Sequence, residues 1–172
     1  IVFGDWSSDV CSSDLGSDMT ALWKKTTVEI IGLVRAGEIS PLEVMEDALR
    51  RIEAINPKLN AFVALDPERS LDEARRKTED LAAGRDIGRL AGLPIGVKDL
   101  EDAAGWPTNY GSVPYKNHVA GSDYIPTARL REAGAIVIGN TNTPEFGVTG
   151  FTRDLLFVAT RTTYHLDMTP GG

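Results

Sequence analysis

The chain has 172 residues, of which 42% are hydrophobic and 25% are charged, a composition typical of one ordinary globular domain. Its formal net charge is −7, and its basic residues alternate with acidic ones, which argues against nucleic-acid binding. Its one cysteine, Cys11, cannot close an internal disulfide, no Cys/His cluster has metal-ligand spacing, and no apolar run approaches the roughly 20 residues that span a bilayer. We therefore expect a cytoplasmic protein without a metal site.

The first twenty residues lack the apolar periodicity that is typical of a folded domain. Ser-Ser-Asp occurs twice there, and the apolar residues follow neither a helical nor a strand period. Such a segment buries too little surface to offset an ordering cost of about 1–2 kcal/mol per residue. The string WSSDVCSSDLG also resembles a translated sequencing-adapter tail. We predict that residues 1–20 are a non-native disordered tail; an anion or metal loop is the weaker alternative.

Two helices are expected next. Residues 26–37 carry apolar side chains at helical spacing and end at a glycine suited to the left-handed position after a helix. Ser40-Pro41-Leu42-Glu43 combines a capping hydroxyl, a proline at the first helical position and a capping-box glutamate. We expect this second helix to stop near Asn56-Pro57, because proline cannot continue the hydrogen-bond ladder.

Strand and helix signals then alternate along the chain. The expected elements are a strand at 60–65, a helix from Asp66-Pro67 to about Ala83, a buried strand at 93–97, a loop at 105–117, a helix at 125–133 and a strand at 135–139. A polar loop from residue 140 should enter a short helix with Thr143 as its cap, followed by irregular chain. This order predicts an α/β fold with a parallel or mixed sheet.

Lys98 is the titratable residue whose position in the sequence is most readily explained by a function. It follows the apolar run LPIGV at the end of an expected strand, and not a charged helix face. Burial there would favour the neutral amine, which can accept a proton. Alternatively, the side chain turns outward and pairs with Asp99 or Glu101. The residues alone leave both interpretations open.

Several blocks of the sequence resemble the opening part of the amidase-signature family, in that family's order and spacing. They are LPIGVKD (93–99), GWPTNYGS (105–112), LREAGAIVIG (130–139), TNTPEFG (141–147) and TPGG (169–172). The resemblance covers about Leu22 to Gly172. It implies the amidase-signature fold, a mixed sheet flanked by helices with only the N-terminal part present, so that residues 21–172 would be an incomplete amidase domain.

The resemblance also implies a reaction. The family hydrolyses a carboxamide to a carboxylate and ammonia through an acyl-enzyme, with a Ser–cis-Ser–Lys triad and no cofactor. Lys98 matches the triad lysine, which works through the cis-serine to activate the nucleophilic serine. Both serines are expected beyond Gly172, so the chain as written should be inactive. Gly147, Gly171 and Gly172 are expected near the substrate, a small-molecule amide.

Other polar residues receive plainer interpretations. Asn140 stands where the family commonly has a lysine, which we interpret as a change on the solvent side. His118 and His165 are expected to be loop residues and not bases. Asp99 should form local hydrogen bonds, and Glu145 should be a helix-start charge.

Two alternative functions stay open at this point. The chain could belong to the amidase subunit of a tRNA-dependent amidotransferase, which takes ammonia from glutamine and works with partner subunits. It could also be a degenerate, non-catalytic paralogue that kept the sheet and lost the serines. Under the amidase interpretation, a homodimer is one assembly that the sequence leaves open, and no direct contact with nucleic acid or membrane is expected.

Overall fold

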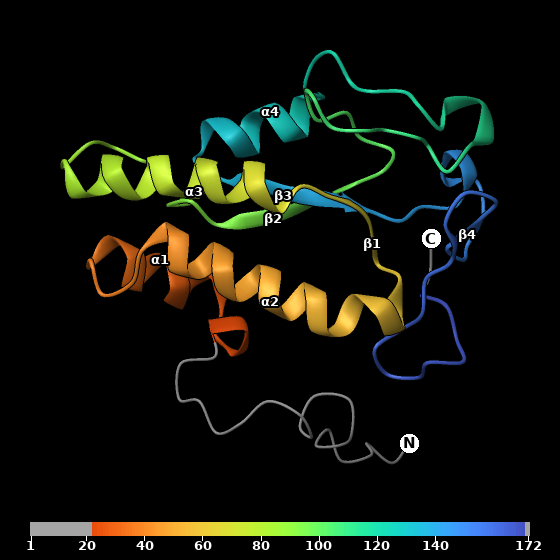
Figure 1. Cartoon of the computed structure of the whole chain (residues 1–172), viewed down its shortest axis with the longest axis horizontal. Helices are drawn as coiled ribbons and strands as arrows, with labels where there is room; N and C mark the ends of the chain where they lie inside the picture. Colours follow the sequence, from red (N-terminus) through yellow and green to blue (C-terminus); the bar gives the residue numbers. More distant parts are fainter. Residues whose placement is uncertain (1–21, 171–172) are drawn as a thin grey trace.

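A mixed three-stranded sheet lies at the centre of residues 22–170, the part of the chain that the computed structural model describes (Figure 1). The strands β1 (Phe62–Leu65), β2 (Pro94–Lys98) and β3 (Ile136–Thr141) are arranged in the order β1-β3-β2. The central strand β3 is parallel to β2 and antiparallel to β1. The predicted α/β fold with a mixed sheet is therefore confirmed. The predicted tail, including Cys11, lies outside the described residues.

The helices begin where their capping residues predict. Helix α1 (Thr27–Arg35) and helix α2 (Pro41–Leu59) both start with a capping box. At α2, the Ser40 hydroxyl accepts the Glu43 N–H at 3.1 Å, and the Glu43 carboxylate accepts the Ser40 N–H at 2.7 Å. Helix α3 (Pro67–Ala82) starts after Asp66, whose carboxylate accepts an N–H from its first turn at 3.0 Å. Each cap satisfies donors that the first turn leaves unpaired.

Helix α2 does not stop at its proline, so the predicted end near Asn56-Pro57 is wrong. Pro57 lies in the last turn and removes only the bond that its own N–H would have donated, so the helix continues to Leu59. The end comes at Asn60, which adopts the left-handed conformation with φ 53°. The Asn56 side chain then accepts the N–H groups of Ala61 and Phe62 at 2.9 and 2.8 Å and ties the helix end to β1.

Both faces of β3 are covered, which fixes the position of its end. On one face, Ile136 and Ile138 pack against Met45 and Ile52 of α2 and Ala74 of α3. On the other face, a second cluster contains Ile95, Val97, Ala103, Trp106 and Val137. Figure 1 shows α2 on one side of the strands and α4 (Ile125–Glu132) on the other. Burial of each large apolar side chain contributes about 1.5–3 kcal/mol, so the centre of the sheet is the most firmly held part of the fold.

The β2–α4–β3 connection is the expected strand–helix–strand unit. Gly134 closes α4 with φ 96°, in space where an added Cβ would lie 2.1 Å from the Ile87 carbonyl oxygen. In contrast to the prediction of a buried strand, β2 is an edge strand of the described sheet and only Val97 in it is fully buried.

The chain after β3 forms turns and a small hairpin. The predicted short helix is a single 3-10 turn, η3 (Glu145–Gly147), and Thr143 does not cap it. Pro144 occupies the cap position, while the buried Thr143 hydroxyl donates to the Pro144 carbonyl at 3.1 Å. Strands β4 (Arg153–Asp154) and β5 (Val158–Ala159) pair antiparallel. Short 3-10 turns also occur at Leu22–Lys24 and Val113–Tyr115. None of the helices found between residues 22 and 170 is long and apolar enough to cross a membrane.

Candidate functional site

Lys98 lies at the carboxyl end of β2 and pairs in register with Thr141 of β3. Its side chain is half-buried. The Lys98 carbonyl accepts the Glu101 N–H at 2.8 Å, so the chain turns immediately after the strand. Among the described residues, no carboxylate lies within 4.0 Å of the Lys98 ammonium group. The alternative in which Lys98 pairs with Asp99 or Glu101 is therefore not what the structure shows.

Lys98 and Asp99 occupy opposite faces of the sheet. An added Cβ at Gly96 would lie 3.0 Å from Thr141 Cγ2, which places Gly96 and Thr141 on one face. Side chains alternate along a strand, so Lys98 shares that face and Asp99 shares the opposite face with Val97. The Asp99 N–H donates to the Thr141 carbonyl at 2.9 Å and continues the ladder one residue further. This alternation explains why two neighbouring residues of opposite charge do not pair.

Asp99 is fully buried and binds the loop that follows β2. Its Oδ1 accepts the Asn109 N–H at 2.7 Å, and its Oδ2 accepts the Gly111 N–H at 3.4 Å. Burial, with a smaller contribution from the Asp154 carboxylate, raises the pKa of Asp99 to about 6, against the lowering effect of these two hydrogen bonds. The hydrogen bonds reach ten and twelve residues along the chain, further than the local bonding expected from the sequence.

The loop bound by Asp99 also packs on the segment that follows β3. An added Cβ at Gly111, which has φ 63°, would lie 3.0 Å from the Thr143 carbonyl oxygen. The Phe146 N–H donates to the Tyr110 carbonyl at 2.8 Å, and the Ser112 hydroxyl donates to the Glu145 carboxylate at 2.7 Å. Glu145 lies at the start of the η3 turn, as expected, and its carboxylate also accepts a hydrogen bond from a neighbouring loop.

Gly147 approaches the side chain of Leu100, which lies two residues after Lys98. It is exposed, has φ 69°, and an added Cβ there would lie 2.8 Å from Leu100 Cδ1. Leu100 is two residues after Lys98, so the predicted substrate-adjacent glycine and the predicted base lie on neighbouring segments. The other two predicted glycines, Gly171 and Gly172, lie outside the described residues.

Asn140 is buried, so the expectation that it faces solvent is wrong. Its exposed fraction is 0%, and neither atom of its amide has a hydrogen-bond partner within residues 22–170. Asn140 pairs in register with Val97 and therefore shares the face of the sheet that carries Asp99. The sequence did not predict that Asp99 and Asn140 are both buried on this face of the sheet. Both residues closely follow apolar strand segments, but a register shift between β2 and β3 near Ile138 breaks the simple alternation, so the sequence alone did not show which face Asn140 shares.

The two histidines are loop residues, as expected. The His118 ring nitrogen Nδ1 lies 2.9 Å from the Thr108 carbonyl oxygen, and the ring packs on Tyr110 at 5.7 Å between centroids. His165 is exposed in the last described segment. Burial raises the pKa of Tyr110 to about 12, and its hydroxyl donates to Asp102 at 2.9 Å, so this phenol stays protonated.

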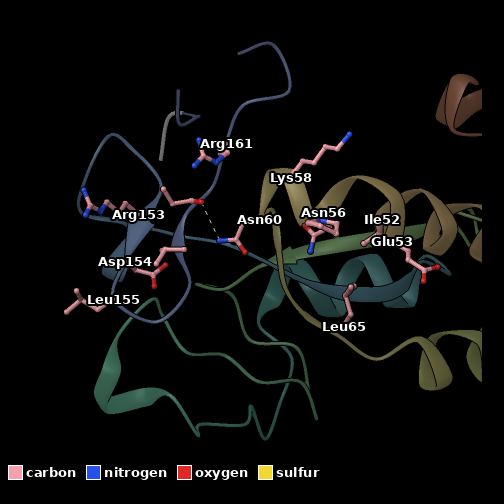
Figure 2. A pocket seen from close by; sticks show the side chains of 13 residues that line it. Ile52, Glu53, Asn56, Lys58, Asn60, Leu65, Arg153, Asp154, Leu155 and Arg161 are labelled. Atoms are coloured by element: carbon pink, nitrogen blue, oxygen red, sulfur yellow. Dashed lines mark hydrogen bonds between the residues drawn. The ribbon is translucent and has the colours of Figure 1, made fainter. Parts of the chain in front are cut away.

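An open pocket of about 840 Å³ lies between the end of α2 and the β4–β5 hairpin (Figure 2). Lys98 does not line it. Of the cationic side chains that line it, Lys58 points away from Arg153 and Arg161 in Figure 2. Between residues 22 and 170, no three metal-ligating side chains come together. The pocket therefore holds no convergent set of chemical groups.

Comparisons with known proteins agree on one family. Residues 43–172 match the family model described as Amidase. Indoleacetamide hydrolase of Bradyrhizobium diazoefficiens is 40% identical over 88% of this chain and 29% of its own length. A glutamyl-tRNA(Gln) amidotransferase subunit of Nostoc punctiforme is 38% identical over 78% of this chain and 28% of its own length. The crystal structure of a bacterial aryl acylamidase of the amidase signature family matches with a TM-score of 0.81 and 32% identity, over 86% of this chain and 31% of that one. The chain thus spans less than a third of the length of these relatives.

Proposed function

This chain belongs to the amidase-signature family, and on that premise we propose that it is part of an enzyme that hydrolyses a carboxamide to a carboxylate and ammonia. The reaction is proposed for the protein that contains the chain, since the relatives are about three times as long. The relative named indoleacetamide hydrolase supports a small-molecule carboxamide as the substrate class.

Lys98 is the proposed base, and its setting is the observation that carries the proposal. A nearby carboxylate would hold a lysine in its charged form, which cannot accept a proton. Lys98 is half-buried at a strand end, two residues before Leu100, and among the described residues no carboxylate lies within 4.0 Å of it. In addition, the central strand β3 is packed on both faces, which gives Lys98 a rigid neighbour.

The proposed chemistry needs two serines in addition to Lys98. Lys98 accepts a proton from the cis-serine, which takes one from the nucleophilic serine as that serine attacks the amide carbonyl. Lys98 returns this proton through the cis-serine to the amide nitrogen, the C–N bond breaks and ammonia leaves. Water then attacks the acyl-enzyme, giving its proton to Lys98 by the same route, and the carboxylate and the free serine are released. We match neither serine to a residue of this chain, and we expect the 172-residue polypeptide alone to be inactive.

The test uses the protein encoded by the complete reading frame, with indoleacetamide as substrate and ammonia release as the readout. We expect Lys98→Ala to lower kcat by at least about 1,000-fold, because removing a triad member destroys activation of the nucleophile. Lys58→Ala removes another lysine, in the last turn of α2, and should leave kcat unchanged. Hydrolysis that is equally fast in the Lys98→Ala variant would refute the assignment.

A second candidate is the amidase subunit of a tRNA-dependent amidotransferase. It is favoured by the 38% identical relative that is named as an amidotransferase subunit. Under this alternative, the same protein should release ammonia from glutamine and need partner subunits. Faster turnover of glutamine than of indoleacetamide would select it, and absence of any turnover would favour the degenerate, non-catalytic paralogue.

A further inference from the structure

The buried carboxylate of Asp99 is held by backbone groups alone. Asn109 and Gly111 donate their N–H groups to its two oxygens at 2.7 and 3.4 Å. Within residues 22–170, no lysine, arginine or histidine nitrogen lies within 4.0 Å of Asp99. Burial of a charge without a counter-ion costs desolvation free energy. We therefore explain Asp99 by the loop that it binds, and not by a net gain in the stability of the fold.

The ionisable groups that act on Asp99 are all acidic. Asp154 of β4 raises the pKa of Asp99, and the Tyr110 phenol in the bound loop interacts with it as well. Lys98, the adjacent residue, lies on the other face of the sheet. Ionised Asp99 therefore depends on the two N–H groups, and the loop depends on ionised Asp99.

The loop connects Asp99 to the Thr143–Gly147 segment, which approaches Leu100, two residues after Lys98. Tyr110 and Ser112 hold Phe146 and Glu145 through hydrogen bonds of 2.8 and 2.7 Å. The same segment ends at Gly147, which packs on Leu100. A change in the charge of the Asp99 carboxylate can therefore displace the Asn109–Ser112 loop and, through its hydrogen bonds, the Thr143–Gly147 segment, where we propose that the substrate binds.

We propose that Asp99 is a positioning residue, whose ionised carboxylate holds the Asn109–Ser112 loop and, through it, the Thr143–Gly147 segment in place against Leu100, two residues after Lys98. This role rests on the proposed function, because it presumes that Lys98 and Gly147 line the reaction site. Asp99 itself touches neither substrate nor the reacting atoms.

The two hydrogen bonds predict what protonation does. The proton goes to Oδ2, because its bond to Gly111 is the longer one, and Oδ1 keeps the Asn109 N–H. The Gly111 N–H then loses its acceptor and the loop loosens at its contact with Thr143–Gly147. Asp99→Asn mimics this state, because one amide oxygen can accept from Asn109 while the NH₂ group faces Gly111.

The first test is NMR on the 172-residue chain. We expect the amide protons of Asn109, Gly111 and Phe146 to shift with a common midpoint near pH 6, the pKa of Asp99. The carboxyl carbon of Asp99, followed by ¹³C-aspartate labelling, should titrate with the same midpoint, a comparison that needs no variant. Asp99→Asn should abolish these shifts, and Glu101→Gln, a matched carboxyl-to-amide control, should preserve them. Amides that do not follow the Asp99 carboxyl would overturn the proposal.

The second test is kinetic and uses the complete-frame protein with indoleacetamide. The ratio of wild-type to Asp99→Asn kcat/KM cancels the titration of every other group. We expect a ratio of about 10 at about pH 8, because misplaced groups cost rate steeply, and a ratio near 1 at about pH 5, where wild-type Asp99 is itself protonated. A ratio that is independent of pH would overturn the positioning role. Activity that does not depend on Lys98 would instead overturn the proposed function.

Discussion

At the scale of single residues, the alternation of a strand separates two adjacent ionisable groups. Lys98 and Asp99 follow each other in the chain but lie on opposite faces of the sheet, and the described residues form no ion pair with Lys98. One face carries the Lys98 amine, and the other carries the Asp99 carboxylate, which binds a loop. The arrangement lets one strand end serve both the proposed proton transfer and the positioning of its surroundings.

Asn140 gives a residue-scale prediction with Asn142 as its matched control. Asn140 has no hydrogen-bond partner for its amide within the described chain, whereas the Asn142 amide donates to Thr160 at 3.0 Å and accepts the Thr143 N–H at 2.9 Å. Removal of an unpartnered buried amide relieves its desolvation cost, while removal of a bonded one leaves its partners unsatisfied.

We therefore expect Asn140→Ala to change the free energy of unfolding by less than about 1 kcal/mol, and Asn142→Ala to lower it by about 2–3 kcal/mol. Urea unfolding of the two variants measures the difference. Equal losses in both variants would mean that Asn140 has a bonding partner in solution.

At the scale of elements, the sequence predicted the starts of the long helices better than the end of α2 or the short turn after β3. Ser40 and Asp66 cap their helices as expected, because a cap depends on residues three positions apart. Pro57 and Thr143 were misjudged, because a proline in a last turn is tolerated and a hydroxyl can bond elsewhere once it is buried. The proposed site divides in the same way: the resemblance predicts Lys98 and Gly147 as site residues, whereas the bonding of Asp99 and the burial of Asn140 depend on tertiary packing.

The turn between α4 and β3 gives a prediction at this scale. Gly134→Ala would place a Cβ 2.1 Å from the Ile87 carbonyl oxygen at φ 96°, whereas an added Cβ at Gly121 would meet nothing within 4 Å. We expect Gly134→Ala to lower the free energy of unfolding by more than about 2 kcal/mol, through strain and backbone displacement, and Gly121→Ala to change it by less than about 0.5 kcal/mol. Thermal unfolding of both variants would show this contrast, and a Gly134→Ala chain as stable as the wild type would contradict the described turn.

At the scale of the whole molecule, apolar surface is unevenly distributed. Large exposed apolar side chains gather after β3, where Val148, Leu155 and Val158 are 78%, 86% and 65% exposed. The outer edge of β2 also has no partner strand among residues 22–170. Exposed apolar surface and open edges of this kind usually contact further protein. This agrees with a chain that spans less than a third of the length of its relatives.

The central claim is that this chain supplies the lysine of a Ser–cis-Ser–Lys amidase. The most direct measurement is to sequence the source DNA through codon 172 and beyond. We predict that the codons after Thr169-Pro170-Gly171-Gly172 encode a Ser-Ser-Gly-Gly stretch, and that a Gly-Gly-Ser follows about two dozen residues later, which would supply both serines to Lys98. A stop codon there, or a continuation without these serines, would contradict the claim and leave Lys98 without a catalytic role.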